Sequence, residues 1–226
     1  VGRAVERAAL PVLPAYEGRM DPERRLRVAF LSPDLMEHSV MRFLEPLVDH
    51  LDRSAFEVVG YYAGVKGDAA TERLRGKVER WRQIPRPEEA EIGRWLIEDG
   101  IDVAVDLAGH TSNSIVYPLR QRVVPVQATW LGYPATTALP GADARPVDEA
   151  TDPEGAERWC TERLVRLPGC FVCFGGVGGA GRLGEAERAK GEVVFGSFNF
   201  LGKLSARTKA LWARVLGAVP GSRLLI

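Results

Sequence analysis

Residues 101–137 read IDVAVDLAGHTSNSIVYPLRQRVVPVQATWLGYPATT, and this stretch decides the fold. Two apolar runs, Asp102 to Leu107 and Val124 to Trp130, each end abruptly in a polar loop that contains glycine. A buried strand that ends in such a loop is typical of an open α/β sheet, and these sheets bind ligands along the carboxyl edge of their strands. The loops at 109–111 and 132–134 are therefore the first candidates for one half of an active site.

Strands and helices alternate on both sides of this stretch. The pattern predicts strands at Leu26–Leu31, Phe56–Tyr62, Trp81–Ile84, Asp143–Val147, Arg163–Leu167 and Val193–Phe198, with a last strand beginning at Leu224. It predicts helices after His38, over Thr71–Val78, from Pro87 to a cap at Gly100, briefly over Ser114–Arg122, and from a cap at Ser205 to Leu216. Short connections between alternating elements are typical of βαβ units, so we expect an α/β fold with a parallel sheet.

Shifts in composition divide the chain into four parts. Residues 1–25 are interpreted as a linker from an upstream helical repeat region, and residues 26–174 as a first lobe. Residues 175–190 form a glycine-rich linker, and residues 191–226 begin a second lobe. Because the chain starts at Val1 and stops inside an apolar run, we expect a fragment of a longer protein.

The composition excludes several classes of partner. Thirty basic and thirty acidic residues give a formal net charge of zero, so neither nucleic acid nor an anionic membrane is expected as a partner. No apolar run approaches the roughly 18 residues of a membrane span, and the start of the chain lacks a signal-peptide pattern. Three cysteines among 226 residues do not suggest a disulfide framework, which favours a cytoplasmic protein.

His38 and His110 are the titratable residues of most interest. Each follows an expected strand, and parallel strands place such loops on one edge, where an imidazole can exchange a proton near neutral pH. A single loop histidine is more often structural, so that alternative stays open. Asp34 is interpreted as the cap of its turn, whereas Asp106 either orients His110 or binds a backbone amide. His50 is expected at the surface.

Lys203 precedes an expected helix start and suits a diphosphate anchor. The chain has no P-loop, and the glycines at 178–184 do not follow a strand, so they are not a dinucleotide-binding motif. Cys170-x-x-Cys173 is half of a zinc pattern without a second half, and no metal is expected there.

Five motifs occur in order along the chain. They are LRVAFLSPD at 26–34 followed by His38, GHT at 109–111, PVQATWLGYP at 125–134, TERLVRLP at 161–168, and FN at 198–199 followed by Lys203. Together they resemble the catalytic region of the O-linked N-acetylglucosamine transferase family, including its bacterial tetratricopeptide-linked and Spindly-type members. The resemblance extends from about residue 26 to residue 226.

The resemblance implies a two-lobed GT-B glycosyltransferase. Such an enzyme moves a sugar with inversion from a UDP-sugar to Ser or Thr hydroxyls of acceptor proteins; N-acetylglucosamine is the expected sugar, and fucose or another sugar stays open. It implies no cofactor besides the UDP-sugar co-substrate and no metal, with tetratricopeptide repeats and a C-terminal lobe elsewhere in the full chain. By resemblance, His38 is a candidate for the general base, with His110 beside it. The residues expected near the sugar and acceptor are Thr111, Gly132, Tyr133 and Pro134. Lys203 and Asn199 are expected at the donor diphosphate.

Two residues depart from the family pattern. Phe200 occupies a position where a polar residue is expected, and the family usually has an arginine near the position of Ile115. The later donor-binding blocks are also absent, so this fragment alone is expected to be inactive.

Two alternative functions follow: a degenerate lobe that serves as a protein-binding scaffold, and a metallohydrolase built on His38, His110 and Asp106. The second is disfavoured because these three residues lack ligand spacing.

Overall fold

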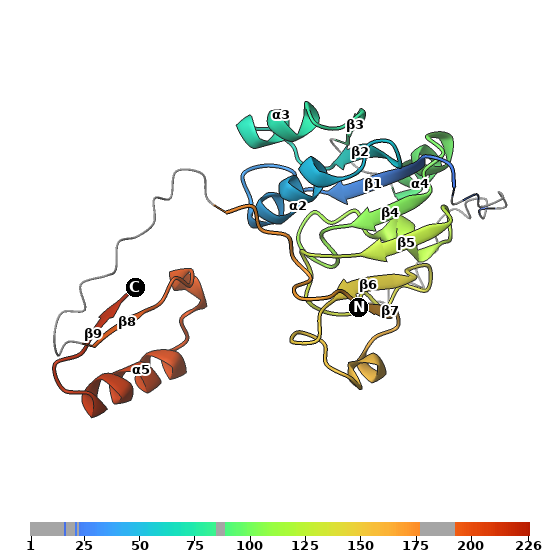
Figure 1. Ribbon diagram of the computed structural model, residues 1–226. Helices are drawn as coiled ribbons and strands as arrows, with labels where there is room; N and C mark the ends of the chain where they lie inside the picture. The colour runs from blue at the N-terminus through green and yellow to red at the C-terminus, as the bar shows by residue number, and fades with distance from the viewer. Residues whose placement is uncertain (1–15, 17–20, 22, 85–88, 177–192) are drawn as a thin grey trace. The chain divides into compact units, whose positions relative to one another are not determined.

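The computed structural model describes residues 16, 21, 23–84, 89–176 and 193–226 (Figure 1). The chain divides into two compact units, Val1–Gly175 and Gly176–Ile226, and each is described by itself. Most of the expected linker at 1–25, and all but the first two residues of the expected linker at 175–190, lie outside the described residues.

The first unit is built on one parallel sheet. Its strands are β1 (Leu26–Ser32), β2 (Phe56–Tyr62), β3 (Arg80–Gln83), β4 (Val103–Asp106), β5 (Val126–Thr129), β6 (Ala144–Val147) and β7 (Arg163–Arg166). The spatial order is β3-β2-β1-β4-β5-β6-β7, and every neighbouring pair is parallel. The strand order reverses between β1 and β4, which makes this junction the topological switch point. The predicted α/β fold with a parallel sheet is confirmed.

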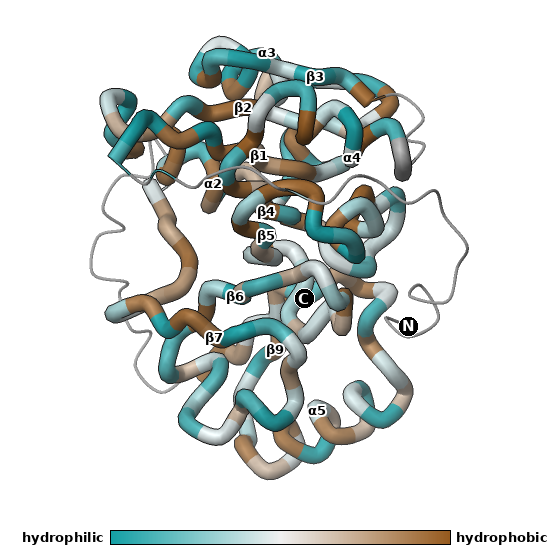
Figure 2. Tube along the Cα trace, turned by 90° about the vertical axis from the view of Figure 1, so that its right-hand side faces the viewer, coloured by the Kyte–Doolittle hydropathy of each residue, from teal (hydrophilic) through white to brown (hydrophobic). Residues whose placement is uncertain are grey.

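Helical segments cover both faces of this sheet. α2 (Ser39–His50) and α3 (Ala69–Arg75) form one apolar cluster that includes Phe30 of β1. α4 (Glu89–Glu98) and the 3₁₀ segment η1 (Tyr117–Arg120) form the other, which includes Leu31. Successive residues of a strand point to opposite faces, so β1 serves both clusters. Figure 2 shows hydrophobic residues along β1 and β2, as burial on both faces requires.

Local capping explains most differences from the expected boundaries. α3 starts before Thr71 because Asp68 caps it, with the side chains of Asp68 and Thr71 forming a reciprocal capping box. The expected helix over 114–122 is only the single turn η1, which has Pro118 among its first residues. Another 3₁₀ turn, η2 (Ala156–Trp159), was not expected. Gly100 has φ +63°, in agreement with its expected role after α4.

The second unit contains β8 (Val194–Gly196), the 3₁₀ segment η3 (Leu201–Lys203), α5 (Ala206–Ala218) and β9 (Arg223–Leu225). β8 and β9 pair in parallel, as expected of a strand–helix–strand unit. Ser205 caps α5 as predicted, because its hydroxyl accepts the backbone N–H of Thr208 at 3.1 Å. Across the described part of the chain, no helix is both long and apolar enough to cross a bilayer.

Candidate active site

Three loops of the first unit lie along the carboxyl edge of adjacent strands. The loop after β1 leads to His38, the loop after β4 carries His110, and the loop after β5 carries Tyr133. The first two flank the switch point between β1 and β4, where open α/β sheets bind ligands. The topology thus brings residues from distant parts of the sequence to one edge.

Asp106 shapes the loop after β4. Its side chain is fully buried and accepts backbone N–H groups from Gly109 at 2.7 Å and Ala108 at 3.3 Å, and the Thr129 hydroxyl at 3.2 Å. Burial raises the pKa of Asp106 from 3.8 to about 6, although these hydrogen bonds favour the ionised form. Of the two roles considered for Asp106, the structure shows backbone-amide binding.

The loops after β4 and β5 interlock through two glycines. Gly109 has φ +55°, and a Cβ atom on it would lie 2.3 Å from Cβ of Tyr133. A Cβ atom on Gly132 would lie 1.9 Å from the carbonyl oxygen of Leu107. Both contacts are far inside the van der Waals limit, so only glycine permits the two loops to approach this closely. The interlocked loops therefore hold Tyr133 against the loop that carries His110.

The backbone of these loops is also strained at residues other than glycine. The N–H of Gly132 donates to the carbonyl of Trp130 at 3.0 Å across Leu131, which has φ +75°. This is a γ-turn with a bulky central residue in the left-handed region. Asn113 and Ala138 also have positive φ, and both lie in loops along the same edge. Residues held in such conformations cluster at ligand sites, which supports a binding role for this edge.

His110 is held between aromatic rings with one ring nitrogen unpaired. Its Nε2 lies 2.7 Å from the carbonyl oxygen of Thr137. The Tyr133 ring meets it edge-on at 5.5 Å between centroids, and the Tyr117 ring lies at 6.3 Å. Its Nδ1 is buried and has no hydrogen-bond partner among the described residues. Because a carbonyl oxygen only accepts, Nε2 carries a proton and, in the neutral ring, Nδ1 has a free lone pair.

His38 is the N-cap of α2. Its exposed side chain accepts the backbone N–H of Val40 at Nδ1, at 3.3 Å. A neutral imidazole that accepts at Nδ1 carries its proton on Nε2. In this arrangement Nε2 is a donor, so His38 can act as a general base only after Nδ1 no longer accepts the hydrogen bond from the Val40 N–H.

The other predicted residues of the first unit differ in exposure. Thr111 and Pro134 are exposed, and Tyr133 is half-buried. Ile115, by contrast, is 2% exposed and belongs to the apolar cluster under η1. An arginine at that position would place a charge in the core, so the position next to the GHT motif serves packing in this chain. The prediction that Asp34 caps the turn after β1 is wrong. The Ser32 hydroxyl caps this turn by accepting the N–H of Asp34 at 2.9 Å.

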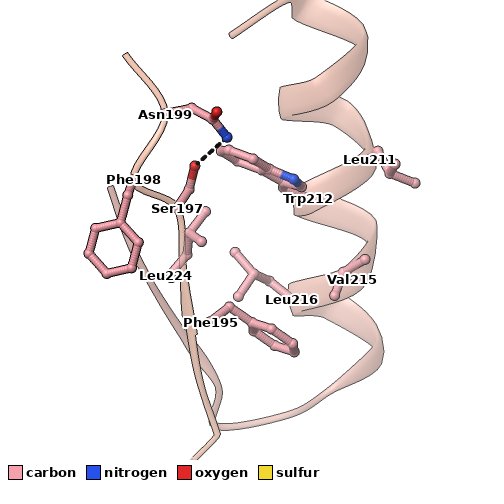
Figure 3. Close-up of a pocket in the computed structure, with 10 residues that line it drawn as sticks. Phe195, Ser197, Phe198, Asn199, Leu211, Trp212, Val215, Leu216 and Leu224 are labelled. Atoms are coloured by element: carbon pink, nitrogen blue, oxygen red, sulfur yellow. Dashed lines mark hydrogen bonds between the residues drawn. The ribbon is translucent and has the colours of Figure 1, made fainter. Parts of the chain in front are cut away.

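In the second unit, Lys203 is exposed and ends η3, two residues before the N-cap of α5. In the same unit, a pocket of about 510 Å³ lies between β8 and α5 (Figure 3). Phe195, Trp212 and Leu216 point into it and make it largely apolar. Asn199 lines the pocket and donates to the Ser197 hydroxyl at 3.4 Å.

Glu162 supports a loop of the candidate site, and the sequence did not reveal this role. It lies just before β7 and is 3% exposed. Its Oε1 accepts the N–H of Thr137 at 2.7 Å and also the Thr137 hydroxyl, and its Oε2 accepts the Thr136 hydroxyl. These partners are 25 and 26 residues away, beyond any local pattern, and the only signal was the occurrence of Glu162 in the TERLVRLP motif.

Within the described ranges, no cluster of three or more His, Cys, Asp or Glu side chains could hold a metal ion. Cys160, Cys170 and Cys173 are free thiols.

Comparisons with known proteins agree with this architecture. The model of glycosyl transferase family 41 matches residues 11–176. A protein of Arabidopsis thaliana, named "Probable UDP-N-acetylglucosamine--peptide N-acetylglucosaminyltransferase SPINDLY", is 41% identical over 221 residues, which are 96% of this chain and 24% of that protein. A Caenorhabditis elegans protein, named "UDP-N-acetylglucosamine--peptide N-acetylglucosaminyltransferase", is 26% identical over 71% of this chain and 14% of its own length.

A solved structure extends the match to the fold. It is a mutant of the O-GlcNAc transferase of Thermobaculum terrenum, with a TM-score of 0.82 and 36% identity, covering 95% of this chain and 41% of that one. The chain spans about a quarter of the length of the plant relatives it matches.

Proposed function

The chain belongs to glycosyl transferase family 41 and has a GT-B fold, and from this premise we propose that the full-length protein is an inverting protein O-glycosyltransferase. It moves N-acetylglucosamine from a UDP-sugar to Ser or Thr hydroxyls of acceptor proteins. The observation that carries the proposal is the set of three loops at the switch point, with His38, His110 and Tyr133 on one carboxyl edge. The names of the relatives supply the sugar, the nucleotide and the class of acceptor.

The proposed division of labour follows from the chemistry of the transfer. The acceptor hydroxyl must lose a proton, and the leaving diphosphate must have its charge neutralised. We assign the diphosphate to Lys203 and Asn199, because an exposed ammonium beside a helix N-terminus suits an anion. The sugar and acceptor are assigned to Thr111 and to the loop at 132–134. His38 is assigned to proton transfer, or to hydrogen bonding through Nε2 while the cap is intact.

Substitution of His38 or Lys203 tests these roles. His38→Ala and Lys203→Ala in the full-length protein are each expected to lower kcat/KM for UDP-N-acetylglucosamine at least about tenfold, or roughly 1.4 kcal/mol of barrier. Transfer to acceptor protein is measured by mass spectrometry, with GDP-fucose as a second donor. If the protein transferred a sugar from GDP-fucose and not from UDP-N-acetylglucosamine, fucose and GDP would replace the sugar and nucleotide proposed here.

His38→Asn is the matched control for the cap, because asparagine is a strong N-cap but has no imidazole. It should unfold at the same temperature as the wild type and still lose activity. Wild-type rates in His38→Asn and Lys203→Ala would remove both residues from the mechanism.

The transfer is proposed to need no metal, since Lys203 and helix N–H groups supply the positive charge. Activity after dialysis against EDTA is therefore expected to remain within about twofold of the untreated rate. A large loss that Mg²⁺ restores would contradict this proposal.

A second function, a non-catalytic scaffold, is favoured by two residues. Ile115 is buried and Phe200 is 78% exposed, so neither offers the polar group expected at its position. Calorimetric titration of the full-length protein with UDP-N-acetylglucosamine and with GDP-fucose separates the two functions. An enzyme should bind one of these donors, whereas a scaffold should show no heat of binding with either.

A further inference from the structure

A continuous chain of hydrogen bonds links Glu162 to His110. Oε2 of Glu162 accepts the Thr136 hydroxyl, whose oxygen accepts the N–H of Ala138 at 3.1 Å. That N–H belongs to the Thr137–Ala138 peptide, and the carbonyl of the same peptide accepts from Nε2 of His110 at 2.7 Å. Oε1 of Glu162 holds the preceding N–H, that of Thr137. One carboxylate therefore fixes the peptide group to which the imidazole donates its hydrogen bond.

Glu162 is suited to this task because it stays ionised. Burial alone would raise its pKa, but hydrogen bonds from Thr136 and Thr137 lower the pKa below the usual glutamate value. Hydrogen bonds to an ionised acceptor are about twice as strong as neutral ones. Ala138, whose N–H belongs to the fixed peptide, has φ +53°, a conformation that costs energy in residues other than glycine.

The arrangement leaves the Nδ1 atom of His110 as an unusual group. It is a buried acceptor with no partner among the described residues, a state that costs free energy until a donor is supplied. In the neutral ring, the proton stays on Nε2 and does not move to Nδ1, because the Thr137 carbonyl would then lose its hydrogen-bond donor. The imidazole is thus locked in the Nε2-protonated form with its basic lone pair unused.

We propose that Glu162 is a positioning residue for His110. By fixing the Thr137–Ala138 peptide, it locks the imidazole in the Nε2-protonated form and keeps the Nδ1 lone pair free to accept a hydrogen bond from a hydroxyl group of the bound substrate. The substrate part rests on the proposed function, whereas the link between Glu162 and His110 does not.

The link is tested by the ring nitrogen resonances of His110 in the ¹⁵N-labelled 226-residue chain. At a pH at which the imidazole is neutral, the wild type should show a protonated Nε2 and an unprotonated Nδ1 as two well-separated signals. In Glu162→Ala the two signals should move toward each other as the second tautomer becomes populated. Glu162→Gln keeps an oxygen for the N–H of Thr137 and should restore most of the separation.

Two further variants isolate the cause. Thr136→Val removes the hydroxyl between Glu162 and the Ala138 N–H without touching the carboxylate, and should shift the His110 signals in the same direction as Glu162→Ala. It also keeps the test valid if Glu162→Ala does not fold. Asp148→Ala is the matched control, since Asp148 is also 3% exposed and holds backbone N–H groups, those of Thr151 and Phe171. It should leave the His110 signals unchanged.

Two results would overturn the link: an Nδ1-protonated wild type, or an unshifted His110 in both folded Glu162→Ala and Thr136→Val. The substrate part is tested in the full-length protein, where Glu162→Ala should lower kcat/KM at least about tenfold and Asp148→Ala less than twofold. Equal rates in Glu162→Ala and the wild type would overturn that part. A wild type that transfers from neither donor refutes the proposed function, and the resonance result then decides the link alone.

Discussion

Gly132→Ala is expected to lower the free energy of unfolding of the first unit by about 3 kcal/mol or more. The new Cβ atom would lie 1.9 Å from the Leu107 carbonyl oxygen, and backbone atoms cannot rotate away as a flexible side chain can. Relief requires the loops after β4 and β5 to separate, which also displaces Tyr133 from its contact with His110. Urea denaturation followed by tryptophan fluorescence measures the loss, because Trp130 is buried next to the substituted loop.

Gly76→Ala is the matched control for this substitution. Gly76 lies in the same unit with φ −71°, and a Cβ atom there would have its nearest neighbours at 3.6 Å, an ordinary contact. Its stability should stay within about 1 kcal/mol of the wild type. If Gly132→Ala were as stable as Gly76→Ala, the interlocked loops would not be packed as described.

Asp106 is expected to give the second large effect, a loss of stability with rising pH. Its pKa is about 6 in the folded state and 3.8 ordinarily, so the folded state binds the proton more tightly than the unfolded state. The stabilising contribution is complete below about pH 4 and is lost as the pH rises to about 6. A difference of two pKa units corresponds to about 3 kcal/mol.

Asp106→Asn isolates this effect, because an amide does not titrate. Other carboxylates, such as Glu157 with its pKa lowered to about 2 beside Arg166, change stability in the opposite direction, but they contribute equally to both proteins. The stability of the wild type relative to Asp106→Asn should therefore fall by about 2–3 kcal/mol between about pH 4 and pH 7.5. A constant difference across that range would mean that Asp106 ionises in the native protein as it does in water.

The sequence predicted the sheet well because its strands are buried on both faces. The apolar run at Phe56–Tyr62 matches β2 residue for residue, since turn-forming residues bound it on both sides. The start of α2 shows where local patterns are insufficient. Ser39 is the residue type that usually caps a helix, yet the preceding His38 does so in the structure. Propensity therefore predicted the helix but not the role of the histidine at its end.

The candidate site was predictable where residues adjacent in the sequence mark its loops. Glycine before His110 and before Tyr133 marked the loops, and the parallel sheet placed both on one edge. The packing of Ile115 and the partners of Glu162 were not predictable, because both depend on residues brought together only by the complete fold. Burial and long-range hydrogen bonds decided these two roles.

The strand order at the switch point also sets the sequence of events during synthesis. Val28 of β1 pairs with Val58 on one side and with Val103 on the other, 30 and 75 residues further along the chain. A growing chain can form the β1–β2 pair early, but the other edge of β1 stays unpaired until β4 leaves the ribosome. An apolar strand with an open edge is prone to pair with other chains, so the nascent protein is exposed to misassembly during this interval. The junction that carries the candidate site is thus also the last part of the central sheet around β1 to close.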